Sequence, residues 1–166
     1  MIARKPMIPL LIIFLVVVFD QLSKWQVMNT FVLFESREIM PGLFNLTYLH
    51  NSGAAFGFLA GNHGPWRQIF FVLIAFAALV FILVAFKHFR HKSLLYIYSL
   101  GLIGGGAVGN LIDRLRFGYV IDFLDFYVKG HHWPAFNVAD SAICVGVGMF
   151  LLAEIRTQRT DNRENA

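Results

Sequence analysis

The stretch GLIGGGAVGNLIDRLRFGYVIDFLDFYVKGHHWPAFNVADSAICVGVG, residues 101–148, decides how this chain folds. It consists of two apolar, glycine-rich segments joined by a polar connection. Four aspartates lie in or beside segments that otherwise suit a lipid environment: Asp113, Asp122, Asp125 and Asp140. An ionisable group is costly to place in lipid, so these aspartates are candidates for function.

The composition indicates an integral membrane protein. Of the 166 residues, 57% are hydrophobic and 18 are phenylalanine, and the mean hydropathy is +0.62. These values lie far from the averages of soluble proteins. The net charge of +4 does not indicate a nucleic-acid partner, because the basic residues form short clusters beside apolar runs, which is typical of membrane topology.

Four apolar runs are long enough to cross a bilayer as helices at a rise of about 1.5 Å per residue. They cover about residues 7–27, 67–86, 94–113 and 137–155. The second run is the clearest, because residues 69–86 contain no charged side chain. In the third run, Gly101, Gly105 and Gly109 recur every four residues, which predicts a helix face that packs closely against a neighbouring helix.

Two longer connections separate these spans, residues 28–66 and 114–136. Within the first, residues 43–50 alternate polar with apolar side chains between the turn sequences PG and NSG, which predicts a small β element at the membrane surface. A short loop, residues 87–93, and a charged tail, residues 156–166, complete the chain, and we expect the tail to be disordered. The sequence therefore predicts a single α-helical membrane domain with four transmembrane helices, a small extracytoplasmic β element and a surface-lying loop.

The basic residues predict how the chain is oriented. Eight of them fall on one side of a four-span arrangement: Arg4, Lys5, Lys87, Arg90, Lys92, Arg156, Arg159 and Arg163. By the positive-inside rule this side is cytoplasmic, so both termini face the cytoplasm. A polar site shared by Asp20, Asp122 and Asp140 would then lie near the outer face of the membrane.

Polar residues recur at helical spacing near the ends of three spans. Asp20 and Lys24 are four residues apart, so they can pair on one face of the first helix. Two further pairs each place an amide and a carboxylate on one helix face: Asn110 with Asp113, and Asn137 with Asp140.

Carboxylates are the side chains best placed to carry chemistry. None of the six histidines lies in an apolar span, Cys144 is the only cysteine, and there is no HExxH sequence, so we expect neither a metal site nor a cofactor. Two close aspartates cannot both ionise readily. One therefore keeps a proton as a general acid, while the other takes a proton from a water that attacks an amide carbonyl. Residue patterns alone do not choose the pair from Asp20, Asp113, Asp122, Asp125 and Asp140.

Four ordered blocks of sequence resemble the bacterial lipoprotein signal peptidases, the signal peptidase II family. The blocks are FDQLSKW (residues 19–25), YLHNSGAAFGFL (48–59), GGAVGNLIDRLRFGYVIDF (105–123) and FNVADS (136–141). The resemblance covers nearly the whole chain. It implies an aspartic endopeptidase of the bacterial inner membrane that removes signal peptides from diacylglyceryl-modified prolipoproteins, cleaving before the lipidated cysteine. We expect a monomer whose partners are these prolipoproteins and membrane lipid.

The same resemblance implies roles for individual residues. Asp122 and Asp140 match the catalytic dyad of the family. Seven further residues match positions that bind substrate or support the site: Asn51, Gly53, Asn110, Arg114, Asn137, Asp20 and Lys24. Asp113 and Asp125 become structural or supporting residues in this interpretation, and residues 31–66 become a cradle or lid over the substrate.

Two other interpretations stay open at this point. A small non-enzymatic transporter or assembly factor would use buried aspartates to relay protons, and changing Asp140 would then abolish flux or partner binding and not cleavage. A presenilin-like or rhomboid-like protease would act on unmodified helices, although the GxGD block of presenilins is absent, since residues 106–110 read GAVGN. Dependence of cleavage on the lipidated cysteine distinguishes these interpretations.

Overall fold

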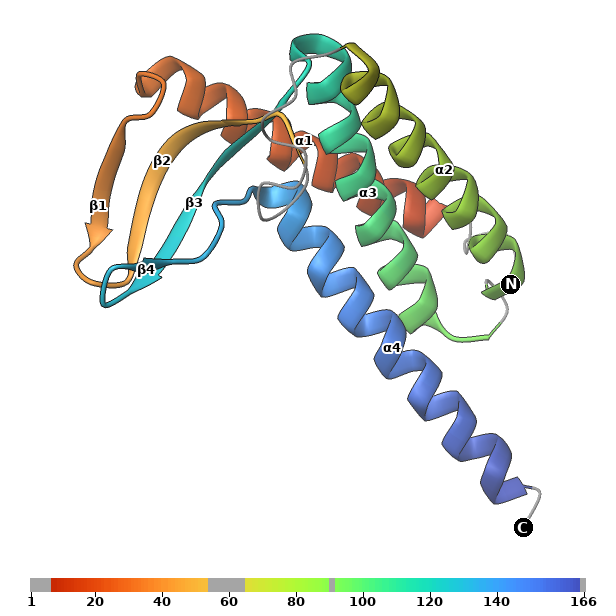
Figure 1. Ribbon diagram of the computed structural model, residues 1–166. Coiled ribbons are helices and arrows are strands. Elements are labelled where there is room, and N and C mark those ends of the chain that lie inside the picture. Colours follow the sequence, from red (N-terminus) through yellow and green to blue (C-terminus); the bar gives the residue numbers. More distant parts are fainter. Residues whose placement is uncertain (1–6, 54–64, 90–91, 165–166) are drawn as a thin grey trace.

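The computed structural model describes residues 7–53, 65–89 and 92–164. Its elements, in chain order, are α1 (Met7–Thr30), β1 (Ser36–Met40), β2 (Phe44–Asn51), α2 (Pro65–Phe89), α3 (Leu94–Phe117), β3 (Val120–Val128), β4 (His131–His132) and α4 (Val138–Glu164). The helices form a bundle, and the strands form a sheet that projects from one end of it (Figure 1).

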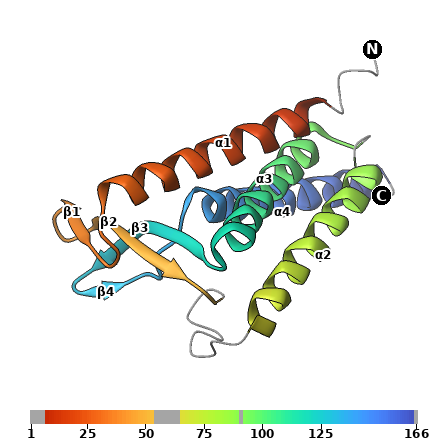
Figure 2. The same cartoon turned by 90° about the horizontal axis from the view of Figure 1, so that it is seen from above.

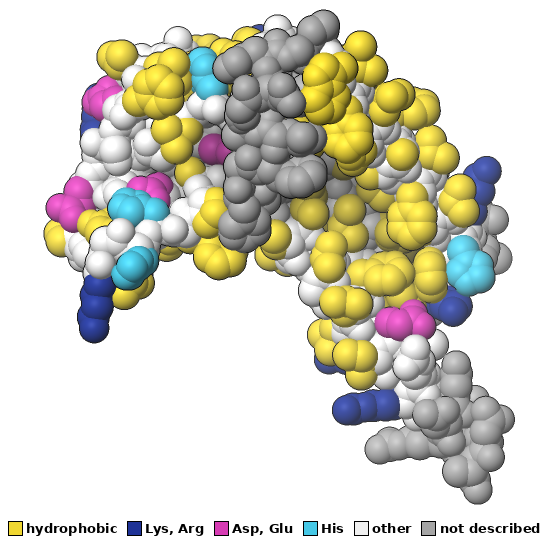
Figure 3. All heavy atoms as spheres, in the orientation of Figure 1, with side chains coloured by type: hydrophobic (Ala, Val, Ile, Leu, Met, Phe, Trp, Pro, Cys, Tyr) yellow, Lys and Arg dark blue, Asp and Glu magenta, His cyan; other side chains and the backbone are white. Residues whose placement is uncertain are grey.

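All four helices are long and apolar enough to cross a membrane, which confirms the predicted fold class. Helix α3 is the centre of the bundle because it packs against α1, α2 and α4. Figure 2 shows α1 and α2 on opposite sides of it. In Figure 3, hydrophobic side chains cover much of the surface over the helices, while charged and histidine side chains gather towards the two ends of this face.

The glycines of α3 allow α1 to approach closely, as their spacing predicts. A Cβ atom on Gly105 would lie 2.7 Å from the Cβ of Val16, which is too close for two carbon atoms. A Cβ atom on Gly109 would lie 2.6 Å from a carboxylate oxygen of Asp20. The small residues of α3 therefore bring the polar end of α1 into contact with α3.

The sheet is antiparallel, with the strand order β1-β2-β3-β4. The predicted β element corresponds to β2, whereas β1, β3 and β4 were not predicted from the sequence. Strand β3 lacks the period-two alternation of a half-exposed strand, because Val120, Ile121 and Phe123 are all buried and its inner half is therefore covered on both faces. It lies within residues 114–136, which the sequence suggested only as a polar connection.

The helices extend further than the hydrophobic runs predict. Most of the expected disordered tail is helical, because α4 continues to Glu164. Residues 156–164 contain neither glycine nor proline, and side chains bridge successive turns there, as in the hydrogen bond from Thr160 Oγ1 to the Arg156 carbonyl. Helix α3 ends only where Gly118 adopts a left-handed φ of 80° and donates its N–H to the Arg114 carbonyl.

Some expectations lie outside the described residues. These are the part of the surface-lying loop in residues 54–64, which includes the end of the YLHNSGAAFGFL block, and the basic residues Arg4, Lys5 and Arg90. The side chain of Arg163 belongs to the same group.

Candidate active site

Strand β3 and the first turn of α4 present Asp122 and Asp140 to the same cavity. This cavity has a volume of about 780 Å³ and is lined by residues of β2, β3, α3 and α4, where the sheet meets the helix bundle. Among the residues that the sequence singled out, six line it: Asn51, Gly53, Asn110, Arg114, Asp122 and Asp140. The side chains of Asn137, Asp20 and Lys24 form the polar network behind its wall.

Two asparagines hold the Asp122 carboxylate. Asn51 Nδ2 donates to Asp122 Oδ2 at 2.8 Å, and Asn137 Nδ2 donates to Oδ1 at 2.7 Å. The N–H of Gly53 in turn donates to Asn51 Oδ1, so the amine end of the Asn51 amide faces the carboxylate. Each carboxylate oxygen therefore has a fixed donor, which orients Asp122 within the cavity.

A third asparagine holds Asp140. Asn110 Nδ2 donates to Asp140 Oδ1 at 2.7 Å. The other end of this amide, Asn110 Oδ1, accepts hydrogen bonds from Lys24 Nζ at 3.2 Å and from Asn137 Nδ2 at 3.3 Å. Because two donors occupy the oxygen, the amine end must point towards Asp140.

At the start of α4, side-chain oxygens accept hydrogen bonds from the backbone N–H groups that have no partner within the helix. Asn137 Oδ1 accepts from the backbone N–H of Asp140 at 2.9 Å, which is an N-cap bond, and Asp20 Oδ1 accepts from the N–H of Ala139 at 2.9 Å. Asp140 is thereby placed in the first turn, where the helix dipole favours negative charge. Asn137 thus caps α4 and holds Asp122 with the same amide.

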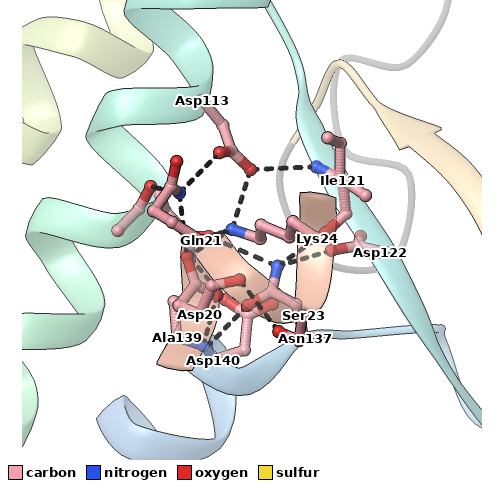
Figure 4. A network of polar contacts seen from close by, with 12 residues as sticks. Asp20, Gln21, Ser23, Lys24, Asp113, Ile121, Asp122, Asn137, Ala139 and Asp140 are labelled. Atoms are coloured by element: carbon pink, nitrogen blue, oxygen red, sulfur yellow. Dashed lines mark hydrogen bonds and ion pairs between the residues drawn. The ribbon is translucent and has the colours of Figure 1, made fainter. Parts of the chain in front are cut away.

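A buried ionic cluster lies behind the two aspartates and joins α1 to α3 and β3 (Figure 4). Lys24 Nζ lies 2.9 Å from Asp20 Oδ2 and 2.7 Å from Asp113 Oδ2, and all three side chains are buried. Asp113 Oδ2 also accepts the N–H of Ile121 at 3.2 Å, directly before Asp122 in the strand. The expected pairing of Asp20 with Lys24 is therefore present, and it belongs to a larger network.

The environment of Asp122 shifts its acidity. Burial and the nearby charge of Asp140 raise the pKa of Asp122 from 3.8 to about 7, against the opposing effect of the Asn51 and Asn137 hydrogen bonds and the charge of Lys24. A carboxyl group with this pKa is suited to proton transfer near neutral pH.

Arg114 is a positive charge at the wall of the cavity. Its Nη1 donates to the Asn110 carbonyl at 3.3 Å, and its guanidinium lies 5.3 Å from the centre of the Phe71 ring. Because the guanidinium carries five donors, Arg114 can also contact a polar group in the cavity.

The sequence patterns missed several residues that shape this region. Gln21 donates to Asp113 Oδ1 at 2.9 Å and to Asp20 Oδ2 at 3.2 Å, although no role was expected for it beyond its place in the FDQLSKW block. Trp133, Pro134 and Ala135 line the cavity, and their position directly before the FNVADS block is the available sequence signal. Among the described residues, no group of three or more His, Cys, Asp or Glu side chains could hold a metal ion.

Asp125 lies on the same strand as Asp122 but away from the cavity. It accepts a hydrogen bond from Asn45 Nδ2 at 2.8 Å, and His132 Nδ1 lies 2.8 Å from its Oδ1. The structure therefore separates Asp125 from the other four aspartates that the sequence left as candidates.

The fold and the cavity together define a class, a polytopic membrane protein with a buried carboxylate site. A family model described as signal peptidase (SPase) II matches residues 12–156. The chain belongs to the signal peptidase II family.

Individual relatives agree with this assignment. A lipoprotein signal peptidase of Geobacter metallireducens is 50% identical over 148 residues, covering 89% of this chain and 90% of that protein. One from Syntrophus aciditrophicus is 45% identical over 157 residues, covering 94% and 98%. A solved structure of a bacterial membrane enzyme, obtained by the in meso method at 2.3 Å resolution, superposes with a TM-score of 0.77 at 33% identity and covers 90% of this chain and 88% of that one.

Proposed function

We propose that this protein removes signal peptides from diacylglyceryl-modified prolipoproteins, cleaving before the lipidated cysteine, with Asp122 and Asp140 as its catalytic dyad. The observation that carries the proposal is the convergence of these two aspartates on one cavity in a member of the signal peptidase II family. The reaction is the hydrolysis of a peptide bond by two carboxyl groups, and it uses no cofactor.

The two aspartates differ in a way that assigns their roles. Asp122 holds a proton near neutral pH because its pKa is raised to about 7. Asp140 lies in the first turn of α4, lines the same cavity and accepts a hydrogen bond from the Asn110 side-chain amide, so it is the carboxylate placed to take a proton. Asp122 is therefore the general acid at the start of the reaction, and Asp140 is the general base.

The proton transfers follow from these starting states. Asp140 takes a proton from water as the water oxygen bonds to the carbonyl carbon, and Asp122 gives its proton to the carbonyl oxygen. The C–N bond then breaks as the leaving amine takes the proton from Asp140. Asp122 regains its proton from the gem-diol as the new carboxyl group forms, so both residues return to their starting states.

The surrounding residues keep the dyad in place. Asn51 and Asn137 orient Asp122, Asn110 orients Asp140, and Gly53 orients Asn51. Arg114 is the donor available to a substrate carbonyl. The pair of Asp20 and Lys24 supports the site from behind by tying α1 to α3.

The protein is a multi-pass protein of the bacterial inner membrane, and we place the cavity near the outer face with both termini in the cytoplasm. The basic residues Lys87, Lys92, Arg156 and Arg159 support this orientation, since they lie towards the helix ends away from the sheet. Strand β2, which contributes Leu49 and Asn51 to the cavity wall, supports a role of residues 31–66 as a cradle for substrate. A monomer is sufficient for this arrangement, since all the proposed site residues come from one chain.

The test is cleavage of a diacylglyceryl-modified prolipoprotein peptide by the purified protein in detergent. We expect the parent to cleave this peptide and to leave the unlipidated peptide intact, and we expect folded Asp122→Asn and Asp140→Asn variants to be inactive. Asp125→Asn is the matched control, because Asp125 lies on the same strand and also accepts an asparagine amide. Activity in either dyad variant contradicts the assignment, and an inactive parent favours the proton-relay alternative.

A further inference from the structure

One face of the sheet continues from Asp122 as an apolar surface. Side chains alternate between the two faces of a strand, so Leu124, Phe126 and Val128 lie on the same face as Asp122. The pairing of β2 with β3 places Leu46 opposite Leu124 and Phe44 opposite Phe126. We call this surface the apolar track and define it as Phe44, Leu46, Leu124, Phe126, Val128 and Phe136.

The track is accessible and continuous. Phe126 is 41% exposed and Val128 is 58% exposed. The Phe126 ring lies 4.8 Å from the ring of Phe44 and stacks with Phe136 at 5.9 Å, so the three rings form one surface. Phe136 also lines the cavity of the dyad, which joins the track to the active site.

The opposite face of the same strands has a different character. Near the bundle it is buried, with Ile121 and Phe123 in the core. Further out it carries polar pairs, namely Asn45 with Asp125 and Glu38 with the hydroxyl of Tyr127. The outer part of the sheet thus has its polar pairs on one face and exposed hydrocarbon on the face that carries Asp122. A sheet in water alone would leave the polar face exposed and bury the apolar one.

We propose that the apolar track binds an acyl chain of the substrate's diacylglyceryl group during cleavage. This inference rests on the proposed function, which places the lipidated cysteine next to the scissile bond and therefore next to Asp122. The backbone N–H and C=O groups of a sheet lie in its plane and not on its faces. The track accordingly offers hydrocarbon contact without hydrogen bonds, which suits an acyl chain better than a peptide.

The length of the track also fits this occupant. The six residue-to-residue steps from Asp122 to Val128 extend about 20 Å at about 3.3 Å per step. An acyl chain that fills one leaflet of a bilayer core of about 30 Å reaches about 15 Å. One chain can therefore lie along the track while its glyceryl end remains beside the dyad.

The experiment compares cleavage of two diacylglyceryl peptides that differ only in the length of their acyl chains. Chains of about 16 carbons would reach along the whole track, and chains of about 8 carbons would reach along half of it. We expect Phe126→Ser to raise KM for the long-chain peptide about tenfold, as the loss of about two methylene contacts would do. We expect KM for the short-chain peptide to rise less than about twofold and kcat to change little for either. Val128→Ser is a second variant. Val128 is more exposed than Phe126, so this substitution is less disruptive to folding and tests the track if Phe126→Ser does not fold.

Phe81→Ser is the matched control, because Phe81 is an exposed phenylalanine of α2 that lies outside both the track and the proposed cradle. If both peptides lose activity equally in the track variants, the track binds membrane lipid in general and the proposal is wrong. An unaltered ratio of long-chain to short-chain KM also overturns it. Failure of the parent to cleave either peptide contradicts the proposed function itself, so the two failures are distinguishable.

Discussion

Two aspartates of β3 each accept a hydrogen bond from an asparagine side chain, but one aspartate lines the cavity and the other lies in the outer part of the sheet. The bond from Asn137 to Asp122 measures 2.7 Å, and the bond from Asn45 to Asp125 measures 2.8 Å. Asn137 is completely buried, and its amide also caps α4 and reaches Asn110. Asn45 is half-buried at the outer part of the sheet, where Asp125 is also paired with the half-exposed His132.

Both aspartates are buried, so the groups around them, and not the hydrogen bond itself, separate the proposed catalytic residue from Asp125. Asp122 faces a second carboxylate across a cavity and is held away from water, so its pKa rises to about 7. Asp125 faces an imidazole near the surface, which is a pairing that stabilises strands. The predictions below test this contrast between the buried junction and the outer sheet.

The largest expected effect is on Lys24, the cation of the buried ionic cluster. Lys24→Met should lower the free energy of unfolding by about 3–5 kcal/mol, because it leaves Asp20 and Asp113 buried without their counter-ion. Thermal unfolding in detergent measures this loss. The exposed Lys129 provides a control, and Lys129→Met should change stability by less than about 0.5 kcal/mol. Similar losses in the two variants would mean that the cluster does not hold the junction together.

A pH profile tests the raised pKa of Asp122. The general acid must be protonated, so kcat/KM should be maintained below the pKa of about 7 and should fall as pH rises through it. A single ionisation gives a decrease that approaches tenfold per pH unit above the pKa, or about fiftyfold between pH 7 and pH 9. Asp125→Asn should leave the profile unchanged. A profile that stays flat to pH 9 would show that Asp122 is not the acid.

The next effect in size is the loss of stability when Asn137 or Asn45 is replaced by alanine. Asn137→Ala removes an N-cap and a donor to a buried carboxylate, and it should lower the free energy of unfolding by about 2–3 kcal/mol. Asn45→Ala removes one donor at the outer sheet and should cost less than about 1 kcal/mol. Chemical denaturation of both variants, measured side by side, provides the comparison. Equal losses would remove the distinction between the two regions.

The smallest effect concerns the surface pair of His132 and Asp125. His132→Gln should change stability by less than about 1 kcal/mol, since exposed ion pairs contribute little, and cleavage should be unaffected. Thermal unfolding at pH 6 and pH 8 together with the peptide assay measures both. A large loss of cleavage would instead connect the outer sheet to the dyad.

The sequence predicted the parts of the fold that arise from local patterns. Four apolar runs predicted the four helices, and alternation predicted β2, because both signals lie within a single element. Strand β3 was missed because its inner residues are buried on both faces. The helical end of α4 was missed because a polar, glycine-free segment differs little in composition from a disordered tail.

The candidate site shows a similar limit. Helical spacing correctly placed Asp20 beside Lys24, since that pair lies within one helix. Spacing could not choose the pair from the five candidates Asp20, Asp113, Asp122, Asp125 and Asp140, because the contacts that distinguish them come from other elements. Only the family resemblance singled out Asp122 with Asp140, and their catalytic roles stay predictions until the variants are tested.

The buried ionic cluster has a consequence for how the protein is made. Lys24 and Asp20 leave the ribosome with α1, but Asp113 and Asn110 follow almost ninety residues later in α3. Until α3 is synthesised, the outer part of α1 carries the charged pair of Asp20 and Lys24 without Asp113 and Asn110 as partners. The cluster is therefore complete only when the third helix is in place, so the burial of the charges on the first helix depends on a segment that is synthesised much later.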